Sequence, residues 1–450
     1  MKFLNKQFTQ ETLKLALPVM LTQVGQVSVN LFDNIIVGKL LGAKALAAVS
    51  LGNAMFFSIF IFGLGFSLAI PPLVSEAHSQ HDHNRINSIF RHGFVVNIIL
   101  AFVLMLLIFG IIPLMPYLNQ PKEILPDTIT FLSIVTLSII PFMIFQTMRE
   151  VSEGLSFTIG VTKATIFANV INVILNYVFI ENFKMGVAGS AWATFIARVA
   201  MMVFLYYVLI KEEKTRRYIK DFSLKIKDFS KEMFEKLIRL GFPTALQLFF
   251  EVTAFAGAAF ICGLISAKDI AAHQIALSMA SFTFNLCVGF SVASTVMIGR
   301  KLGEKDFVNL EKVGFNNLKI AFIFMLICGL VFILGKDVLP TFFTKKEDIA
   351  VVELASQLMI IAALFQLSDG IQVTALGCLR GIQDVKIPSI LTFIAYWVIT
   401  IPLGYYLTVP MKMGAFGMWI ALGIGLTISA VLLVIRFRNL SEKRIKAQSN

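Results

Sequence analysis

The sequence predicts an all-α integral membrane protein with twelve transmembrane helices, arranged in two six-helix lobes that are related by a pseudo-twofold axis along the membrane normal. Composition, the lengths of the apolar runs and an internal repeat support this fold class. The chain is 57% hydrophobic and only 15% charged, with a mean hydropathy of +0.81, which exceeds the range of a soluble domain. Several runs reach the roughly 20 apolar residues that a spanning helix needs, whereas a β-barrel shows short alternating segments.

The internal repeat relates the two halves of the chain. Residues 17–50 align without a gap with the stretch at 240–275, and each matched pair lies 225 positions apart (243 − 18), half of the 450 residues. The matches in this stretch include Pro18 with Pro243, Gly38 with Gly263 and Ala47 with Ala272. Past this stretch the repeat continues at slightly different spacings, with Gly65-Phe66-Ser67 matching Gly289-Phe290-Ser291 and Lys184-Met185-Gly186 matching Lys412-Met413-Gly414. Because each copy holds an even number of spans, both copies enter from the same side, which places the axis along the membrane normal.

Taken in order, the apolar runs predict spans at 13–38, 46–74, 93–115, 128–148, 162–182, 186–210, 238–265, 270–298, 314–336, 352–374, 386–408 and 414–436. The chain then divides into an N-terminal six-helix lobe at 1–210, a basic cytoplasmic linker at 211–237, a C-terminal six-helix lobe at 238–436 and a cytoplasmic tail at 437–450.

The distribution of positive charge predicts the orientation. About 29 of the 39 Lys and Arg residues lie on the same predicted side of the membrane as the N-terminus, the linker and the tail, and about nine lie on the opposite side. We therefore expect both termini on the cytoplasmic side of a bacterial inner (plasma) membrane. The net charge of +12 follows this positive-inside pattern, so no nucleic-acid partner is expected. Membrane lipids are the expected surroundings, and we expect a monomer. The linker either lies along the anionic inner leaflet or is a solvated connector.

Three acidic residues lie deep in predicted spans, namely Asp33, Glu251 and Asp369. A charge at mid-membrane depth costs several kcal/mol, so such residues mark functional sites. No opposite charge lies one helical turn away from any of them. Each should therefore face a cavity, bind a cation or carry a proton. A buried carboxylate that exchanges H⁺ or Na⁺ competes with a cationic substrate for the same charge, which predicts coupled transport.

Neutral polar residues complete the candidate sites. Asn176 and Thr194 could place oxygen atoms near Asp33 in a coupling-ion site, or could hydrogen-bond a neighbouring helix instead. Gln26 aligns with Glu251 in the repeat, which suggests that both face a central cavity. The predicted substrate contacts are Asp33, Gln26, Glu251, Gln274, Gln366 and Asp369, and no cofactor is expected besides the coupling ion, Na⁺ or H⁺.

The histidines and cysteines are assigned structural roles. His78, His81, His83 and His92 are interpreted as part of a solvated cytoplasmic loop rather than a metal site, and His273 as a packed residue near a helix start. Cys262, Cys287, Cys328 and Cys378 have no metal-ligand spacing, which favours small buried residues.

These residues favour a secondary antiporter that exports lipophilic cations by alternating access. A flippase for a lipid-linked precursor is the alternative within transport, although it would need cavity-lining Arg and Lys, and Arg198 is almost alone inside a span. A membrane-embedded enzyme would need His, Asp or Ser residues that converge at one membrane face, whereas the acids here are spread over different spans. A passive channel predicts oligomeric pore symmetry. The Gly-rich loop of an ATP-binding module is absent from the sequence.

Several motifs resemble the multidrug and toxic compound extrusion (MATE) family, and its NorM-type bacterial branch in particular. They are LALPVMLTQVGQ and FDNIIVG in the first span, FFEVTAFA and AAHQIA at the seventh and eighth, and FQLSDGIQVTALGCLRGIQD at the tenth. The resemblance covers nearly the whole chain. It implies two six-helix lobes and export of cationic amphiphiles against Na⁺ or H⁺.

The resemblance also implies roles for individual residues. Asp33 with Asn176 and Thr194 corresponds to a first-lobe cation site, and Glu251 with Asp369 to a second-lobe site. Glu153 matches a further acidic position of the first lobe. Two departures bear on the ion: Phe365 stands where close relatives have tyrosine, and Ile180 stands where some members have a carboxylate. The identity of the coupling ion therefore stays open at this point.

Overall fold

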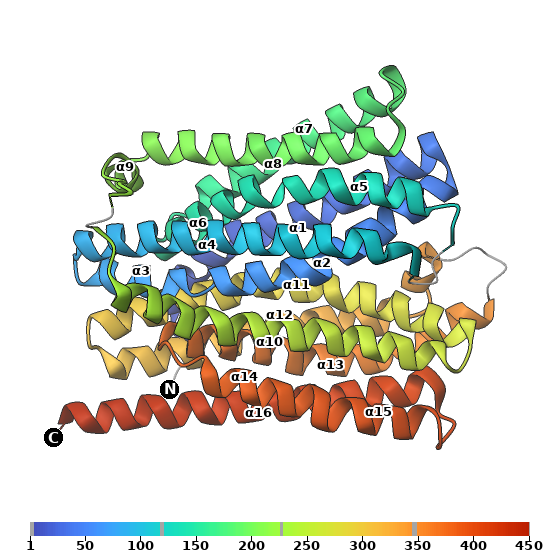
Figure 1. Cartoon of the computed structure of the whole chain (residues 1–450). Coiled ribbons are helices and arrows are strands. Elements are labelled where there is room, and N and C mark those ends of the chain that lie inside the picture. The colour runs from blue at the N-terminus through green and yellow to red at the C-terminus, as the bar shows by residue number, and fades with distance from the viewer. Residues whose placement is uncertain (1–3, 118–120, 226–227, 344–348, 450) are drawn as a thin grey trace. The chain divides into compact units, whose positions relative to one another are not determined.

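The computed structural model describes residues 4–117, 121–225, 228–343 and 349–449, and within them the regular structure is helical throughout (Figure 1). Among these residues, 11 helices are long and apolar enough to cross a membrane. A further pair, α5 (Leu125–Leu137) and α6 (Ile139–Gly154), passes the same test together and bends by 42° at its break. Counting that pair as one span gives 12, so the predicted twelve-helix fold class of a multi-pass membrane protein is confirmed.

The remaining helices cover the predicted spans, but several extend beyond the predicted ends, and the last one runs to Ser449 through the predicted tail. The short helix Glu213–Lys220 lies in the predicted linker. In the first half of the chain the helices are α1 (Lys6–Leu41), α2 (Ala43–Ser67), α3 (Ile70–Ser79), α4 (His83–Ile111), α7 (Ile159–Tyr177), α8 (Gly186–Lys211) and α9 (Glu213–Lys220). In the second half they are α10 (Lys231–Gly263), α11 (Ala267–Gly303), α12 (Phe307–Gly335), α13 (Ile349–Gly381), α14 (Lys386–Phe393), α15 (Ile401–Thr408) and α16 (Gly414–Ser449). Two spans contain a π-helical segment, Val178–Asn182 after α7 and Ile394–Thr400 between α14 and α15.

The chain forms two compact units. One consists of residues Met1–Met20 and Leu246–Asn450, and the other of residues Leu21–Ala245. Below they are called the C-terminal unit and the N-terminal unit. Helix α1 and helix α10 each begin in one unit and end in the other. The lobe and linker bounds drawn from hydropathy at 210, 237 and 436 are a different division and stay a prediction.

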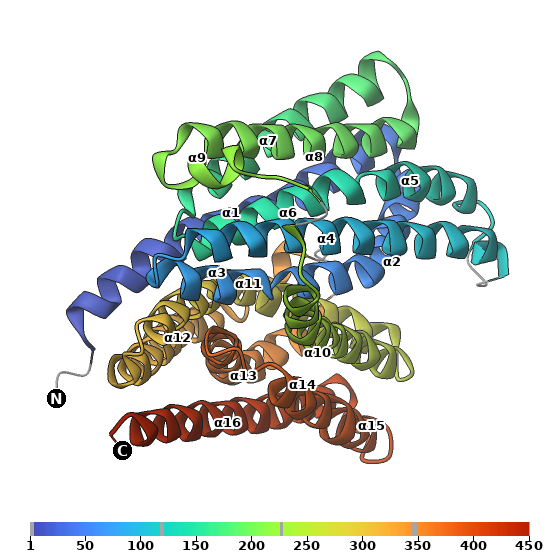
Figure 2. The same cartoon turned by 60° about the vertical axis from the view of Figure 1, so that its left-hand side comes forward.

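Each unit has its own packed core. In the C-terminal unit α13 packs against α11, α12 and α16, and α15 lies beside α16 in both views (Figures 1 and 2). In the N-terminal unit α7 lies beside α8, and α4 packs against α6 and α2. Small residues let the helices approach closely, as expected for helices that associate without a hydrophobic driving force.

The backbone repeats its unusual conformations at equivalent positions of the two halves. The residues with positive φ pair as His81 with Lys305, Ser156 with Gln383, Lys184 with Lys412, and Gly186 with Gly414, all between 54° and 65°. Helix starts pair as well: Asp82 accepts a hydrogen bond from the backbone N–H of Arg85, and Asp306 accepts one from that of Asn309. Because a left-handed backbone is uncommon outside glycine, its recurrence shows that the sequence repeat is a structural repeat.

A repeated glycine marks a close helix crossing in each unit. A Cβ on Gly65 of α2 would lie 2.6 Å from the Cα of Ala245 in α10, and one on Gly289 of α11 would lie 2.8 Å from the carbonyl oxygen of Ala16 in α1. These glycines are matched in the sequence repeat. The start of α10 therefore packs in the N-terminal unit as the start of α1 packs in the C-terminal unit.

The prediction that His78, His81, His83 and His92 lie in a solvated loop is wrong for most of this stretch. Only residues 80–82 separate α3 from α4, and His92 is fully buried on α4. Its Nδ1 donates to the carbonyl oxygen of Ser88 at 2.7 Å, and its Nε2 accepts from the backbone N–H of Ser230 at 2.9 Å. The third span begins ten residues before its predicted start, at His83 rather than at 93, because the Asp82 cap and the buried Ile86 and Ile89 continue the helix past the apolar run.

Candidate functional site

Two of the predicted carboxylates lie buried in the C-terminal unit. Glu251 of α10 is 6% exposed and Asp369 of α13 is 4% exposed. The Oε1 atom of Glu251 accepts a hydrogen bond from Nε2 of Gln372, one helical turn beyond Asp369, at 3.3 Å. The phenol of Tyr396 donates to Oε1 of Gln372 at 3.1 Å and lies 3.5 Å from Oε1 of Glu251. Helices α10 and α13 and the π-helical segment thus meet at one polar cluster.

The charges of this cluster do not balance. Glu251 and Asp369 interact electrostatically with each other, and the cationic side chain that acts on Glu251 is Arg380, near the end of α13. Two carboxylates near one guanidinium sum to one negative charge when both are ionised. Since an uncompensated charge is expensive away from water, this arrangement favours uptake of a proton or another cation.

Tyr396 is the member of this cluster that sequence reasoning missed. The π-helical segment Ile394–Thr400 carries it, and the Thr400 hydroxyl donates to the carbonyl oxygen of Ala395 at 2.8 Å inside that segment. Trp397 donates from Nε1 to the carbonyl oxygen of Phe250 at 3.1 Å, which ties the segment to α10. A π-helical turn rotates the following side chains out of the regular helical register, and such turns are frequent at functional sites.

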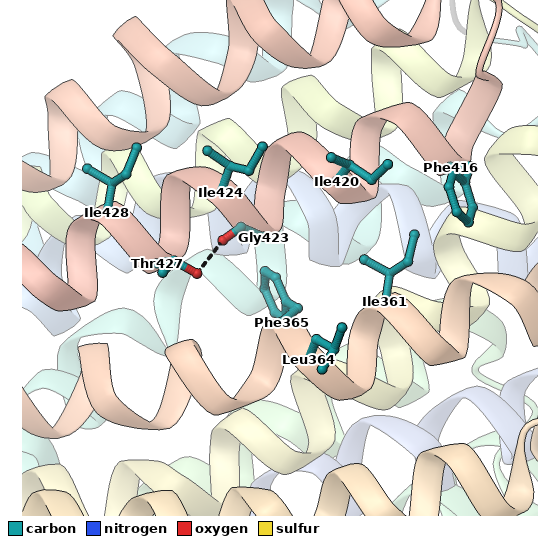
Figure 3. A pocket seen from close by; sticks show the side chains of 9 residues that line it. All are labelled: Ile361, Leu364, Phe365, Phe416, Ile420, Gly423, Ile424, Thr427 and Ile428. Carbon is teal, nitrogen blue, oxygen red and sulfur yellow. Dashed lines mark hydrogen bonds between the residues drawn. The ribbon is translucent and has the colours of Figure 1, made fainter.

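Aromatic rings lie next to the carboxylates. The ring of Phe255 lies 5.8 Å from Tyr396 and 6.2 Å from Phe365, and Phe365 lies 5.4 Å from Trp419, all between centroids. Phe365 also lines an open apolar cavity of about 450 Å³ between α13 and α16. Figure 3 shows this cavity, whose lining residues are Ile361, Leu364, Phe365, Phe416, Ile420, Gly423, Ile424, Thr427 and Ile428. Along α13, the lining residue nearest to Asp369 is Phe365, one helical turn before it.

The predicted glutamines occupy three different environments. Gln366 is fully buried, and its Oε1 accepts from the Thr283 hydroxyl at 2.9 Å. Gln26 is half-buried on α1, and Gln274 is exposed on α11. His273, next to Gln274, is fully buried with its ring 5.9 Å from that of Trp419, so the predicted packed position is confirmed.

In the N-terminal unit the structure brings two of the three predicted first-lobe residues together. Asn176 of α7 donates from Nδ2 to Oδ1 of Asp33 on α1 at 2.5 Å, and both residues are buried. The hydroxyl of Thr194 instead donates to the carbonyl oxygen of Ser190 at 3.1 Å and accepts from Asn172 at 3.5 Å. Thr194 therefore makes interhelical and local hydrogen bonds, which was the alternative interpretation of this residue.

Arg198 of α8 is the positive charge next to this site. It interacts electrostatically with Asp33. The ion pairs found within 4 Å among the described residues do not include one between Arg198 and Asp33. Sequence reasoning noted Arg198 as a lone cation inside a span but could not place it beside Asp33, because 165 residues separate them (198 − 33).

Two further acidic residues of this unit that the sequence singled out have cationic partners. Glu153 is buried on α6 and accepts a hydrogen bond from Nε of Arg149 at 2.7 Å. Glu181, beside the buried Ile180, is 41% exposed and pairs with Lys184 at 3.0 Å. Among the residues that the structure describes, no group of three or more His, Cys, Asp and Glu side chains is arranged to hold a metal ion.

Comparison with known proteins gives a consistent result. The sequence model of the MatE family matches residues 18–178 and 243–406, one segment in each half. The multidrug resistance protein NorM of Photobacterium profundum is 31% identical over 439 residues, which cover 96% of this chain and 95% of that protein. The probable multidrug resistance protein NorM of Agrobacterium fabrum is 33% identical over 445 residues, which cover 97% and 94%.

A solved structure agrees in fold. It is described as an outward-facing conformation of a multidrug resistance MATE family transporter of the MOP superfamily. It matches with a TM-score of 0.89 at 21% identity and covers 97% of this chain and 96% of its own. The family model matches more than two thirds of the chain, and the NorM relatives match nearly all of it. The chain therefore belongs to the MatE family, whose members are transporters and not enzymes.

Proposed function

We propose that this multidrug efflux transporter of the MATE/MOP superfamily is a secondary antiporter, which exports lipophilic cations from the bacterial cytoplasm in exchange for a proton. The observation that carries the proposal is the buried pair Glu251 and Asp369. Among the residues that the structure describes, the cation that acts on this pair is Arg380, through Glu251. Such a pair takes up one positive charge from either side of the membrane. A coupling ion and a cationic substrate compete for it, which is the basis of exchange.

The hydrogen bonds at Glu251 favour a proton over Na⁺ as the coupling ion. Na⁺ requires several oxygen atoms that present lone pairs to it. Here Gln372 presents its N–H₂ to Glu251, and its amide oxygen already accepts from Tyr396. Phe365, one helical turn before Asp369, is fully apolar and offers no oxygen atom to an ion. Na⁺ remains the second ion to be tested.

The aromatic rings around the pair suit the apolar part of a lipophilic cation. Phe255, Phe365 and Trp419 form a continuous layer from Tyr396 to the wall of the α13–α16 cavity. Apolar and cation–π contacts bind such compounds without strict shape requirements. The proposed substrate contacts are Glu251, Asp369, Gln366 and Gln274 in the C-terminal unit and Asp33 and Gln26 in the N-terminal unit.

The proposed cycle couples these sites by alternating access. The substrate binds from the cytoplasm while the carboxylates are ionised, and proton uptake from the outside weakens that binding and releases it. Both termini lie in the cytoplasm, and the protein acts as a monomer among membrane lipids. Asn176 holds Asp33 in a fixed orientation, as its 2.5 Å hydrogen bond supports. Thr194 takes part through α8 packing.

The test measures efflux of the fluorescent cation rhodamine 6G from proteoliposomes, with a pH gradient and a Na⁺ gradient imposed separately. Wild type is compared with Glu251→Gln, Asp369→Asn and Asp33→Asn. The matched control is Glu353→Gln, an exposed glutamate on the same helix as Asp369. We expect the pH gradient to accelerate efflux in wild type and in the control. Glu251→Gln and Asp369→Asn should lose that acceleration, and Asp33→Asn should keep it at a reduced rate.

Other results have definite meanings. If only the Na⁺ gradient accelerates efflux, the coupling ion is Na⁺ and not a proton, and it binds at the same residues. If neither gradient changes efflux and the carboxylate variants behave like wild type, the antiporter proposal is wrong. The flippase alternative would then be tested with lipid-linked substrates.

A further inference from the structure

Arg198 is held at three points within the N-terminal unit. Its Nη1 donates to the Ser138 hydroxyl at 2.6 Å, and its guanidinium carbon lies 4.7 Å from the ring centre of Phe56 and 5.1 Å from that of Phe142. These contacts come from α2, from α6 and from the break between α5 and α6. A guanidinium that stacks on two rings and donates to a hydroxyl is fixed in place, unlike a flexible lysine ammonium.

The position of this fixed charge relative to Asp33 is unusual. A structural ion pair would bring the guanidinium onto the carboxylate, but here Asp33 is hydrogen-bonded by Asn176. Arg198 acts on Asp33 through space. It is also only half-buried, whereas Asp33 and Ser138 are buried. Arg198 therefore acts on the charge of Asp33 without forming an ion pair with it among the residues that the structure describes.

The two charges sum to zero when Asp33 is ionised. A neutral pair attracts a cation far more weakly than a lone carboxylate does, since the attraction by Asp33 and the repulsion by Arg198 largely cancel with distance. This contrasts with the C-terminal unit, where Arg380 acts on Glu251 and the neighbour that acts on Asp369 is a second carboxylate, Glu251. One unit thus carries a compensated acidic site and the other an uncompensated one.

We propose that Arg198 is a charge-selectivity residue of the first-lobe site: its fixed guanidinium lowers the affinity of that site for cationic amphiphiles relative to amphiphiles without net charge. The inference rests on the proposed function in so far as it takes Asp33 to meet the substrate. It goes beyond that proposal by assigning to a cation, and not to a carboxylate, the control of which charge the site prefers. A weaker first-lobe site also releases its cation more readily.

The test compares two dyes of similar shape, the monocation rhodamine 6G and the zwitterion rhodamine B. Equilibrium binding to the full-length protein in nanodiscs is measured by fluorescence polarisation. We expect Arg198→Met and Arg198→Gln to bind rhodamine 6G about tenfold more tightly, equivalent to about 1.4 kcal/mol, and to change rhodamine B binding less than twofold. Arg198→Lys keeps the charge and should stay within threefold of wild type for both dyes.

A double variant separates electrostatics from structure. Asp33→Asn should weaken rhodamine 6G binding about tenfold, and combining it with Arg198→Met should recover most of that loss. Lys211→Gln is the matched control, because Lys211 lies on the same helix and contacts an aromatic ring, Tyr207, at 4.4 Å. It should bind both dyes as wild type does.

The outcomes distinguish this inference from the proposed function. If Arg198 only holds the α5–α6 break, its variants will lower the melting temperature and leave the affinity ratio of the two dyes unchanged, which overturns the inference. The same holds if Arg198→Lys behaves like Arg198→Met. If wild type binds neither dye and shows no gradient-driven efflux, the proposed function itself has failed. Two uncharged replacements are included so that one variant remains for the comparison if the other does not fold.

Discussion

Gln372 and Glu251 are joined by a hydrogen bond of 3.3 Å between α13 and α10, and Tyr396 holds the amide of Gln372 in the orientation that this bond requires. The Tyr396 hydroxyl donates to the amide oxygen, so the amide nitrogen is turned toward the carboxylate. Tyr396 therefore determines how Glu251 is hydrogen-bonded, although its own hydroxyl lies 3.5 Å from that carboxylate.

Replacing Tyr396 by Phe removes this control. We expect proton-driven efflux of rhodamine 6G to fall up to about tenfold, in line with the roughly 0.5–1.5 kcal/mol of a hydrogen bond between neutral groups. The ring contact with Phe255 is kept, so the melting temperature should fall by only a few degrees. Tyr405→Phe, at an exposed position of α15 in the same span, should leave efflux unchanged. Equal effects of the two variants would argue against this role of Tyr396.

The glycine at the α2–α10 crossing should be essential for stability. A Cβ on Gly65 would meet backbone atoms of Ala245, which cannot move aside as a side chain does. We expect Gly65→Ala to cost about 1–3 kcal/mol, typical of overpacking, measured as a lower melting temperature in detergent. A Cβ on Gly110 of α4 meets nothing within 4 Å, so Gly110→Ala should be neutral or stabilise by up to about 1 kcal/mol. A drop of similar size in both variants would contradict the assigned crossing.

The cap of α12 should make stability depend on pH in a defined range. Burial raises the pKa of Asp306, but the hydrogen bonds from Asn309 and the nearby Lys301 outweigh it, and the net pKa lies below its ordinary 3.8. With a lowered pKa in the folded state, the charged form adds stability that is complete above 3.8 and is lost as pH falls through the lower value. Asp306→Asn keeps an acceptor for the cap but has no charge.

Melting temperatures of wild type and Asp306→Asn are therefore compared at pH 7, 5, 4 and 3. We expect wild type to be the more stable at pH 7 and 5, and the difference to shrink between pH 4 and 3. A difference that stays constant over this range would show that the charge of Asp306 contributes nothing.

His92 should control how firmly the segment before α10 is attached to α4. Its ring accepts from the Ser230 N–H and packs against Phe229 and Phe234, with centroids at 5.1 and 4.6 Å. His92→Ala leaves a donor without its partner and removes both ring contacts, at a cost of about 2 kcal/mol. We expect trypsin to cleave at Lys231 several-fold faster. Asn84→Ala, at an exposed position of the first turn of α4, should be cleaved at the wild-type rate.

The sequence was sufficient to predict the parts of the fold that depend on local composition and on repetition. Apolar run length predicts the spans, and the repeated Lys-Met-Gly stretch recurs as the same left-handed backbone at Lys184 and Lys412. The helix ends were less predictable. Residues such as Ile86 and Ile89 continue α4 beyond the apolar run because they pack inside the protein, which hydropathy does not register.

The candidate site shows the same limit. Asp33, Glu251 and Asp369 are detectable because a carboxylate in an apolar run is conspicuous by itself. Tyr396 and Arg198 are not, because their importance lies in atoms that are far away in sequence and become neighbours only through helix packing. A tyrosine in an apolar span is ordinary until a π-helical turn directs it toward Gln372. The motif resemblance pointed to Asn176, and the structure places it on Asp33.

The exchange of helix starts between the units has a mechanical consequence. The units meet along the chain at only two points, Met20 to Leu21 and Ala245 to Leu246, and both points lie inside continuous helices. Pro18 and Pro243 stand just before them inside α1 and α10, where a missing N–H removes a helical hydrogen bond and makes bending easier. Both connections between the units thus run through a helix that is locally easier to bend, at positions that match in the internal repeat.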